Sequence, residues 1–306
     1  MNTRKIISVF ALLLMGVGIA YADVDLPSEF TNQGSIGNTR HNMTQRQASG
    51  GGPFGVNMDP YRNDYEEICV YCHTPHGASS AVTLPLWNRT IKVTTYATYN
   101  ELGTASLTQS VSQPGANSLS CLSCHDGQTA IDSIINMPGS GRYQASQATA
   151  QDNNFLNSWN NARGPDATVH LGLNVVPGAG CLACHSAAAG FVGAGATDFS
   201  VFAIGTDLRN DHPVGITYPA TTGTVPDFKT PLAKKGSTFF FDVDADGYLD
   251  SGEVRLYDNA GAAKVECASC HDPHGVPSGG AGSVFKPSFL RVANTNSALC
   301  LTCHTK

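Results

Sequence analysis

The sequence has few of the features that mark an ordinary enzyme domain or a membrane protein. Charged residues make up only 14% of the 306 residues, and turn-forming residues are frequent, with 32 Gly and 16 Pro. Long runs with helical periodicity are hard to find. Beyond residue 22, no apolar run approaches the roughly 18 residues of a membrane-spanning helix. These absences argue against a membrane span and against an ordinary helical or α/β domain.

The first 22 residues are typical of a secretory signal peptide. Arg4 and Lys5 form a positive start, residues 6–20 are almost wholly apolar, and residues 20–22 form a small-residue cleavage site. The mature chain is expected to begin at Asp23 and to be exported. No cysteine lies near the cleavage site to carry a lipid anchor.

Basic residues are too scarce for a nucleic acid or an anionic membrane to be a good partner. The chain has 18 basic and 24 acidic residues, and loss of Arg4 and Lys5 leaves 16 basic residues and a formal charge of −8. A negative chain is repelled by phosphate-rich surfaces, so neither partner is expected.

No cysteine lies outside five pairs of identical spacing, and a histidine follows each pair directly. Numbered in chain order, motifs 1 to 5 are Cys69/Cys72/His73, Cys121/Cys124/His125, Cys181/Cys184/His185, Cys267/Cys270/His271 and Cys300/Cys303/His304. A disulfide framework or a zinc site would explain paired cysteines but not the five histidines. Cys-X-X-Cys-His is the attachment motif of c-type haem, so we expect five covalent haems.

The spacing of the motif suits this chemistry because residues three apart share one face of a helical turn. Both thiols would then reach the two vinyl groups of one porphyrin, and the adjacent histidine would be the proximal iron ligand. The expected fold is a multihaem c-type cytochrome, mostly coil with short helices wrapped around a chain of five haems and with little β structure. It would occupy residues 23–306 as one domain.

The remaining histidines equal in number the second axial positions that five haems require. They are His41, His76, His170, His212 and His274. Imidazole is the commonest metal ligand, although a histidine unrelated to iron is the alternative at each position. Methionine would raise the reduction potential, but Met43, Met58 and Met137 lie in no haem-motif context.

Two of these histidines follow a proximal ligand by three residues, His76 in Cys-His-Thr-Pro-His-Gly and His274 in Cys-His-Asp-Pro-His-Gly. Neither is expected to reach the far face of its own haem, so each is expected to ligate a neighbouring haem. Iron with two histidine ligands has no open position for a substrate. We therefore expect one-electron transfer at low potential and no enzymatic activity.

Residues 242–253 fit the twelve-residue calcium loop at every ligand position. The expected ligands of one Ca²⁺ are Asp242, Asp244, Asp246, Tyr248 through its carbonyl, Asp250 and Glu253. The flanks at 239–241 and 254–257 look like short strands or a helical turn and not like the long helices of a calcium sensor, so the ion would be structural. A solvated acidic loop is the alternative, as is Mg²⁺, which demands stricter octahedral geometry.

Several segments of the sequence are similar to segments of exported multihaem cytochromes of metal-reducing bacteria. They are the tail with motifs 4 and 5 (267–304) and the stretches 40–44, 69–77, 85–89 and 211–215. The resemblance extends to outer-surface cytochromes that polymerise into conducting filaments, and it implies head-to-tail self-association. A chain with five haems departs from the haem counts of the known filament formers.

In such filaments a histidine of one subunit completes the haem coordination of the next subunit. His41 is the best candidate for that donated ligand, because it precedes motif 1 and lies near the Gly-rich run 49–53. His170 and His212 are the alternatives. A head-to-tail contact that does not close into a ring builds an open fibre.

The resemblance implies a conduit at the cell surface or outside the cell, which passes electrons to other redox proteins or to extracellular acceptors. The alternative is a soluble periplasmic shuttle that resembles the five-haem electron donors of nitrite reductase. A haem-dependent reductase would need five-coordinate iron, and the five additional histidines argue against it.

Overall fold

The computed structural model describes residues 34–43, 65, 67–91, 95–136, 172–173, 180–183, 185–189, 198–221, 225–231, 233–258, 261–276 and 289–306. The predicted signal peptide lies outside these residues, as do Cys184, His170, Met58 and Met137.

Helices in the described part of the chain are short. The α-helices are α1 (Ala116–His125), α3 (Cys267–Cys270) and α4 (Ala298–Cys303). The 3-10 helices are Ile36–Asn38, Cys69–Tyr71, Tyr99–Leu102, Gly180–Ala183, Ala187–Ala189, Ser200–Phe202 and Thr295–Ser297. This low helix content agrees with the expected coil-rich fold.

A small antiparallel sheet of five strands occupies part of the C-terminal half. Its strands are β1 (Ile216–Thr217), β2 (Ala233–Lys235), β3 (Thr238–Phe240), β4 (Arg255–Asp258) and β5 (Ala263–Val265), in the spatial order β1-β5-β4-β3-β2. The sequence predicted short strands or a helical turn on either side of the acidic loop, and the structure has the strands β3 and β4 there. They pair with Phe240 opposite Arg255.

The sheet packs around a hydrophobic core in which, among the described residues, the partly buried Cys303 is the only member that belongs to a haem motif. Its buried members are Tyr218, Ala220, Phe241, Val254, Leu256, Ala263 and Val265. Two smaller clusters lie under motifs 1 and 2, one around Tyr71 and Ile134 and the other around Leu122 and Tyr96. The core is therefore divided into separate apolar clusters, two of which lie beside haem motifs.

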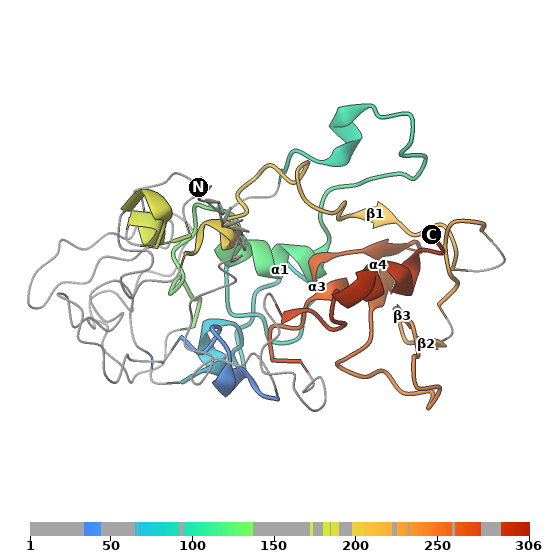
Figure 1. Cartoon of the computed structure of the whole chain (residues 1–306). Coiled ribbons are helices and arrows are strands. Elements are labelled where there is room, and N and C mark those ends of the chain that lie inside the picture. Colours follow the sequence, from blue (N-terminus) through green and yellow to red (C-terminus); the bar gives the residue numbers. More distant parts are fainter. Residues whose placement is uncertain are drawn as a thin grey trace, which may run out of the picture.

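The motif-bearing helices lie together beside the sheet. Figure 1 shows α1 and α3 in the middle of the molecule, with α4, β1, β2 and β3 on the side of the C-terminus. Helix α3 contacts both α1 and β4. Since α3 begins two residues after β5 ends, the sheet fixes where motif 4 meets motif 2.

Candidate haem sites and acidic loop

Every motif lies on a helical turn, as its spacing predicted. Motif 2 lies within α1, and the others lie on shorter turns whose backbone closes from the histidine N–H to the carbonyl of the first cysteine. These bonds are 2.7 Å long for His73, 3.0 Å for His185, 3.1 Å for His271 and 2.9 Å for His304. The nine described cysteines form no disulfide.

Two proximal histidines have their ring Nδ1 held by a backbone carbonyl. The Nδ1–H of His73 donates to Pro85 O at 3.0 Å, and that of His125 donates to Phe202 O at 2.6 Å. Because a carbonyl only accepts, these bonds fix the tautomer that leaves Nε2 with its lone pair. Both rings are thus arranged to bind a metal through Nε2.

Three of the predicted second ligands are held in the same way. The Nδ1–H of His41 donates to Pro273 O at 3.3 Å, and that of His212 donates to Pro213 O at 3.1 Å. The ring of His274 uses a carboxylate instead, Asp272 Oδ1 at 3.1 Å. Each of these three imidazoles therefore also offers Nε2 as a ligand atom.

Each of these three histidines also lies near a proximal histidine of some motif. The ring centres of His41 and His125 are 6.3 Å apart, and those of His274 and His73 are 6.1 Å apart. Burial, and then the charge of His304, lowers the pKa of His212. Of the other two predicted second ligands, His76 lies on an exposed turn, and His170 lies outside the described residues.

Burial and the neighbouring His125 lower the pKa of His41 to about 4. The imidazole is then neutral at physiological pH, which is the protonation state that binds metal. Burial likewise lowers the pKa of His125, which favours the same state.

Cysteines of different motifs lie close enough to affect each other's pKa. Burial, and then the nearby thiol of Cys124, raises the pKa of Cys72 to about 12, which connects motif 1 with motif 2. The neighbouring thiol of Cys267 raises the pKa of Cys121, and helices α1 and α3, which carry motifs 2 and 4, pack against each other. Burial, and then the charge of Cys270, raises the pKa of Cys303 to about 12. Neighbouring thiols therefore form a series from motif 1 through motifs 2 and 4 to motif 5.

Motif 3 joins motif 2 through a single short segment. The ring of His185 stacks on Phe199 at 4.0 Å with an interplanar angle of 4°. Phe199 precedes the 3-10 helix whose Phe202 carbonyl holds the ring of His125. Motif 2 is thus a neighbour of motifs 1, 3 and 4.

A buried glutamate joins the two helices that carry motifs 2 and 4. The Glu266 carboxylate accepts the N–H of Gly115 at the start of α1 and the hydroxyl of Ser118 at 2.5 Å. It also forms a capping box with Ser269 at the start of α3. Burial raises the pKa of Glu266 against the opposing effect of these hydrogen bonds. No local pattern in the sequence distinguishes Glu266 from other glutamates, so it was not among the predicted site residues.

A buried arginine joins motif 1 to the turn of motif 2. The Arg89 side chain is 0% exposed, and its guanidinium donates to the carbonyls of Ser123, Ala130 and Ile131 and to the Ser123 hydroxyl at 2.7–3.1 Å. The preceding Asn88 donates to Val70 O within motif 1 at 2.7 Å. The stretch 85–89 therefore has a structural role that its residues alone did not reveal.

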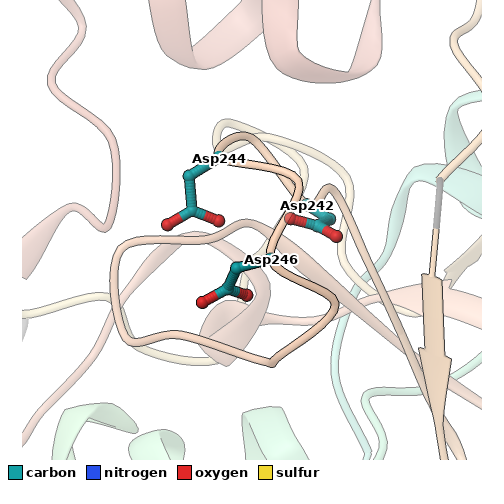
Figure 2. A group of neighbouring side chains, drawn as sticks. All are labelled: Asp242, Asp244 and Asp246. Carbon is teal, nitrogen blue, oxygen red and sulfur yellow. The ribbon is translucent and has the colours of Figure 1, made fainter.

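Three acidic side chains of the predicted calcium loop converge. The carboxylates of Asp242, Asp244 and Asp246 lie within 4.8 Å of one another, and Figure 2 shows them gathered around one turn of the loop. The Oδ1 atom of Asp242 is buried and has no hydrogen-bond partner. An unpaired buried carboxylate oxygen is the kind of group that a cation would satisfy. These residues therefore fit a hard divalent cation.

The remaining predicted ligands differ in how they are placed. Glu253 is 2% exposed, and its two carboxylate oxygens accept the N–H groups of Val243 and Asp250 at 3.0 and 2.9 Å. Each oxygen keeps a further lone pair for a cation. Asp250 and Tyr248 lie on the exposed side of the loop.

The acidic loop is also connected to a histidine. Arg291 is 5% exposed, and its Nη1 donates at 2.8 Å to Ser251 O in the loop and to Asp272 Oδ2. Burial would raise the pKa of Asp272, but the bonds from His274 and the charge of Arg291 lower it to about 2. Asp272 is therefore a carboxylate that orients His274 on one side and binds Arg291 on the other.

Comparison with known proteins identifies the C-terminal motifs. The doubled CXXCH motif family matches residues 260–306, which contain motifs 4 and 5. The match supports covalently bound haem c and haem-based electron transfer in this chain. A search of curated proteins found no match. Among the described residues, no helix has both the length and the apolarity to cross a bilayer.

Proposed function

We propose that the chain transfers electrons through five covalently bound, bis-histidine c-type haems, one on each Cys-X-X-Cys-His motif. The observation that carries this proposal is that thiols of motifs 1, 2, 4 and 5 lie near one another, while the stack of His185 on Phe199 places motif 3 beside motif 2. Haem supplies reversible one-electron chemistry, and the protein supplies the spacing. Motifs in contact place their cofactors next to one another, which is the arrangement that a relay needs.

The histidines of this chain would close the iron to substrates and would not activate it for catalysis. Nδ1 anchors orient His41, His212 and His274 for use as second ligands, and a six-coordinate iron has no open position. The proposed activity is therefore electron transfer and not catalysis.

Two measurements on the purified exported protein test this proposal. Intact mass under denaturing conditions should show five haem increments, because the attachment is covalent. Carbon monoxide added to the reduced protein should leave the Soret band unshifted. Fewer haems would refute the stoichiometry, and a shift equivalent to a whole haem would show an open iron and favour a haem-dependent reductase.

We also propose that residues 242–253 bind one structural Ca²⁺. The converging carboxylates and the unpaired oxygen of Asp242 support this assignment, and the strands β3 and β4 hold the two ends of the loop. A loop held at both ends by one sheet stays in place, which favours a fixed ion over a sensor that opens.

The proposed cellular role is a conduit at the cell surface or outside the cell, assembled head to tail from copies of this chain. Two features support this role: several sequence segments resemble those of filament-forming cytochromes, and the chain has a predicted signal peptide. A soluble periplasmic shuttle is the second candidate, favoured by a five-haem content unlike that of known filament formers.

Electron microscopy separates the two roles. The surface-sheared fraction of the native producing cells would be imaged by negative stain, and mass spectrometry would confirm that the haem-stained chain is present. Uniform fibres built from this chain would support the conduit. A five-haem monomer confined to the periplasm would refute the conduit and favour the shuttle.

A further inference from the structure

We propose that His41 and His125 are the two axial ligands of one iron, in the haem carried by Cys121 and Cys124, and that His274 and His73 form a second such pair at Cys69 and Cys72. This inference rests on the proposed haem loading and deepens it, because it assigns individual ligands to individual haems.

The ring separations and the Nδ1 contacts together carry the proposal. An imidazole nitrogen binds a transition metal at about 2 Å, and its ring centre lies roughly 1.1 Å further out, so two imidazoles on opposite sides of one metal have centres about 6.3 Å apart. The observed separations are 6.3 Å for His41 and His125 and 6.1 Å for His73 and His274. Ring pairs that share no metal span 4.0 Å, as in His185 on Phe199, to 6.1 Å, as in Phe199 and Phe202, so the separation supports the assignment only together with the polar contacts of the rings.

The polar contacts of the four rings point to the same assignment. In each ring Nδ1 is engaged by a carbonyl or carboxylate, at Pro273 for His41, Phe202 for His125, Pro85 for His73 and Asp272 for His274. Nε2 is then the metal-binding nitrogen in all four rings.

The position of His41 is fixed by contacts with its own chain. Its ring stacks on Phe289 at 4.5 Å and 5°. The turn before it docks on the segment after motif 4, where Gly34 N–H donates to Val276 O at 2.9 Å. Gly275, at φ +104°, lies so close to Ser35 that a Cβ would be 3.3 Å from its backbone.

The other side of the first pair is fixed as well. The guanidinium of Arg40 lies 5.1 Å from the centre of the Phe202 ring, and the carbonyl of Phe202 holds His125. Phe202 thus contacts Arg40, the neighbour of His41, and also holds the ring of His125. If His41 is a ligand within its own subunit, as proposed here, it differs from the sequence-based interpretation of His41 as the ligand donated to a neighbour.

The two pairs differ in one measurable property. The imidazole planes are nearly perpendicular in the first pair, at 78°, and nearly parallel in the second, at 16°. In low-spin ferric haem, parallel planes split the iron d orbitals and give a rhombic electron paramagnetic resonance signal. Perpendicular planes leave two orbitals nearly degenerate and give a strongly anisotropic signal with one dominant low-field feature.

The test records these spectra on the five-haem monomer, isolated by size exclusion and checked by intact mass. The wild type should show both kinds of component. His41→Ala should remove a strongly anisotropic component, add a high-spin signal of one haem in five, and bind one carbon monoxide per chain when reduced. His274→Ala should remove a rhombic component instead. Ser35→Ala is the matched control, because this exposed side chain makes no cap bond beside the same turn.

A second variant keeps the test decisive if the alanine variants fold poorly. His41→Met retains a possible sixth ligand and should raise the reduction potential of one haem while the others stay unchanged. Five haems with unaltered spectra and potentials in the His41 variants would overturn the first pair. Loss of a rhombic component in His41→Ala would overturn the assignment of planes to pairs. A haem count below five would instead count against the proposed function.

Discussion

Replacement of Arg89 by methionine tests whether one buried side chain holds motifs 1 and 2 together. The guanidinium supplies donors to three carbonyl oxygens and one hydroxyl, all within a region where Arg89 itself is 0% exposed. Methionine fills a similar volume but donates no hydrogen bond. A buried acceptor left without a donor costs about 1–3 kcal/mol.

The lower end of that range applies, because removing Arg89 also removes the cost of burying its charge. Three carbonyls at about 1 kcal/mol each give a loss of roughly 3 kcal/mol in the free energy of unfolding. Arg89→Lys should lose less, since an ammonium group retains some donors but cannot reproduce the planar fork.

The assay is guanidinium chloride denaturation followed by far-ultraviolet circular dichroism, with the haem content matched by intact mass. Arg209→Met is the control, because Arg209 is an exposed arginine bonded to Asp207 and near Glu101. Its unfolding midpoint should equal that of the wild type. If Arg89→Met were as stable as this control, the proposed connection between the two motifs would be refuted.

Three further predictions concern Glu266 and the acidic loop. Glu266→Ala should destabilise the protein by about 1–2 kcal/mol through loss of a helix cap, measured by the same denaturation. Burial raises the pKa of Glu266 above 4.5, so the folded protein holds this proton to a higher pH than the unfolded chain. As the pH rises from 4.5 through the raised pKa, the free energy of unfolding of the wild type should fall relative to that of Glu266→Gln. A difference between the two that stays constant with pH would contradict this. Removal of calcium by a chelator should lower the thermal midpoint, since an ion that binds only the native state stabilises it. Asp242→Asn should be insensitive to the chelator, and an unchanged wild-type melting curve would favour a solvated acidic loop.

The sequence was informative wherever function depends on local spacing. The helical turns of the motifs and the strands on both sides of residues 242–253 follow from patterns a few residues long. The positions of the motifs relative to one another do not, since they depend on side chains that bond to distant backbone. Arg89 reaches carbonyls 34 to 42 residues away, and Glu266 reaches Gly115 across 151 residues. A single arginine or glutamate carries no sign of such a partner.

Gly215 is another residue whose role depends on tertiary contacts and not on local sequence. The stretch 211–215 was noticed for its resemblance, but the reason for its last residue is tertiary. Gly215 has φ +72°, and a Cβ there would lie 2.5 Å from Ser112 O. Its own N–H donates to Val265 O in β5, so this glycine lets two distant segments meet in front of the sheet. Only the folded chain shows that a side chain would not fit.

The Glu266 carboxylate has a consequence for how evenly current would flow. Electron tunnelling slows exponentially as the gap between cofactors widens, so thermal movement of a coil-rich chain would make each hop irregular. By bonding the first turns of α1 and α3, Glu266 makes motifs 2 and 4 move together. In the proposed conduit, a residue without redox chemistry would therefore hold the width of one tunnelling barrier constant.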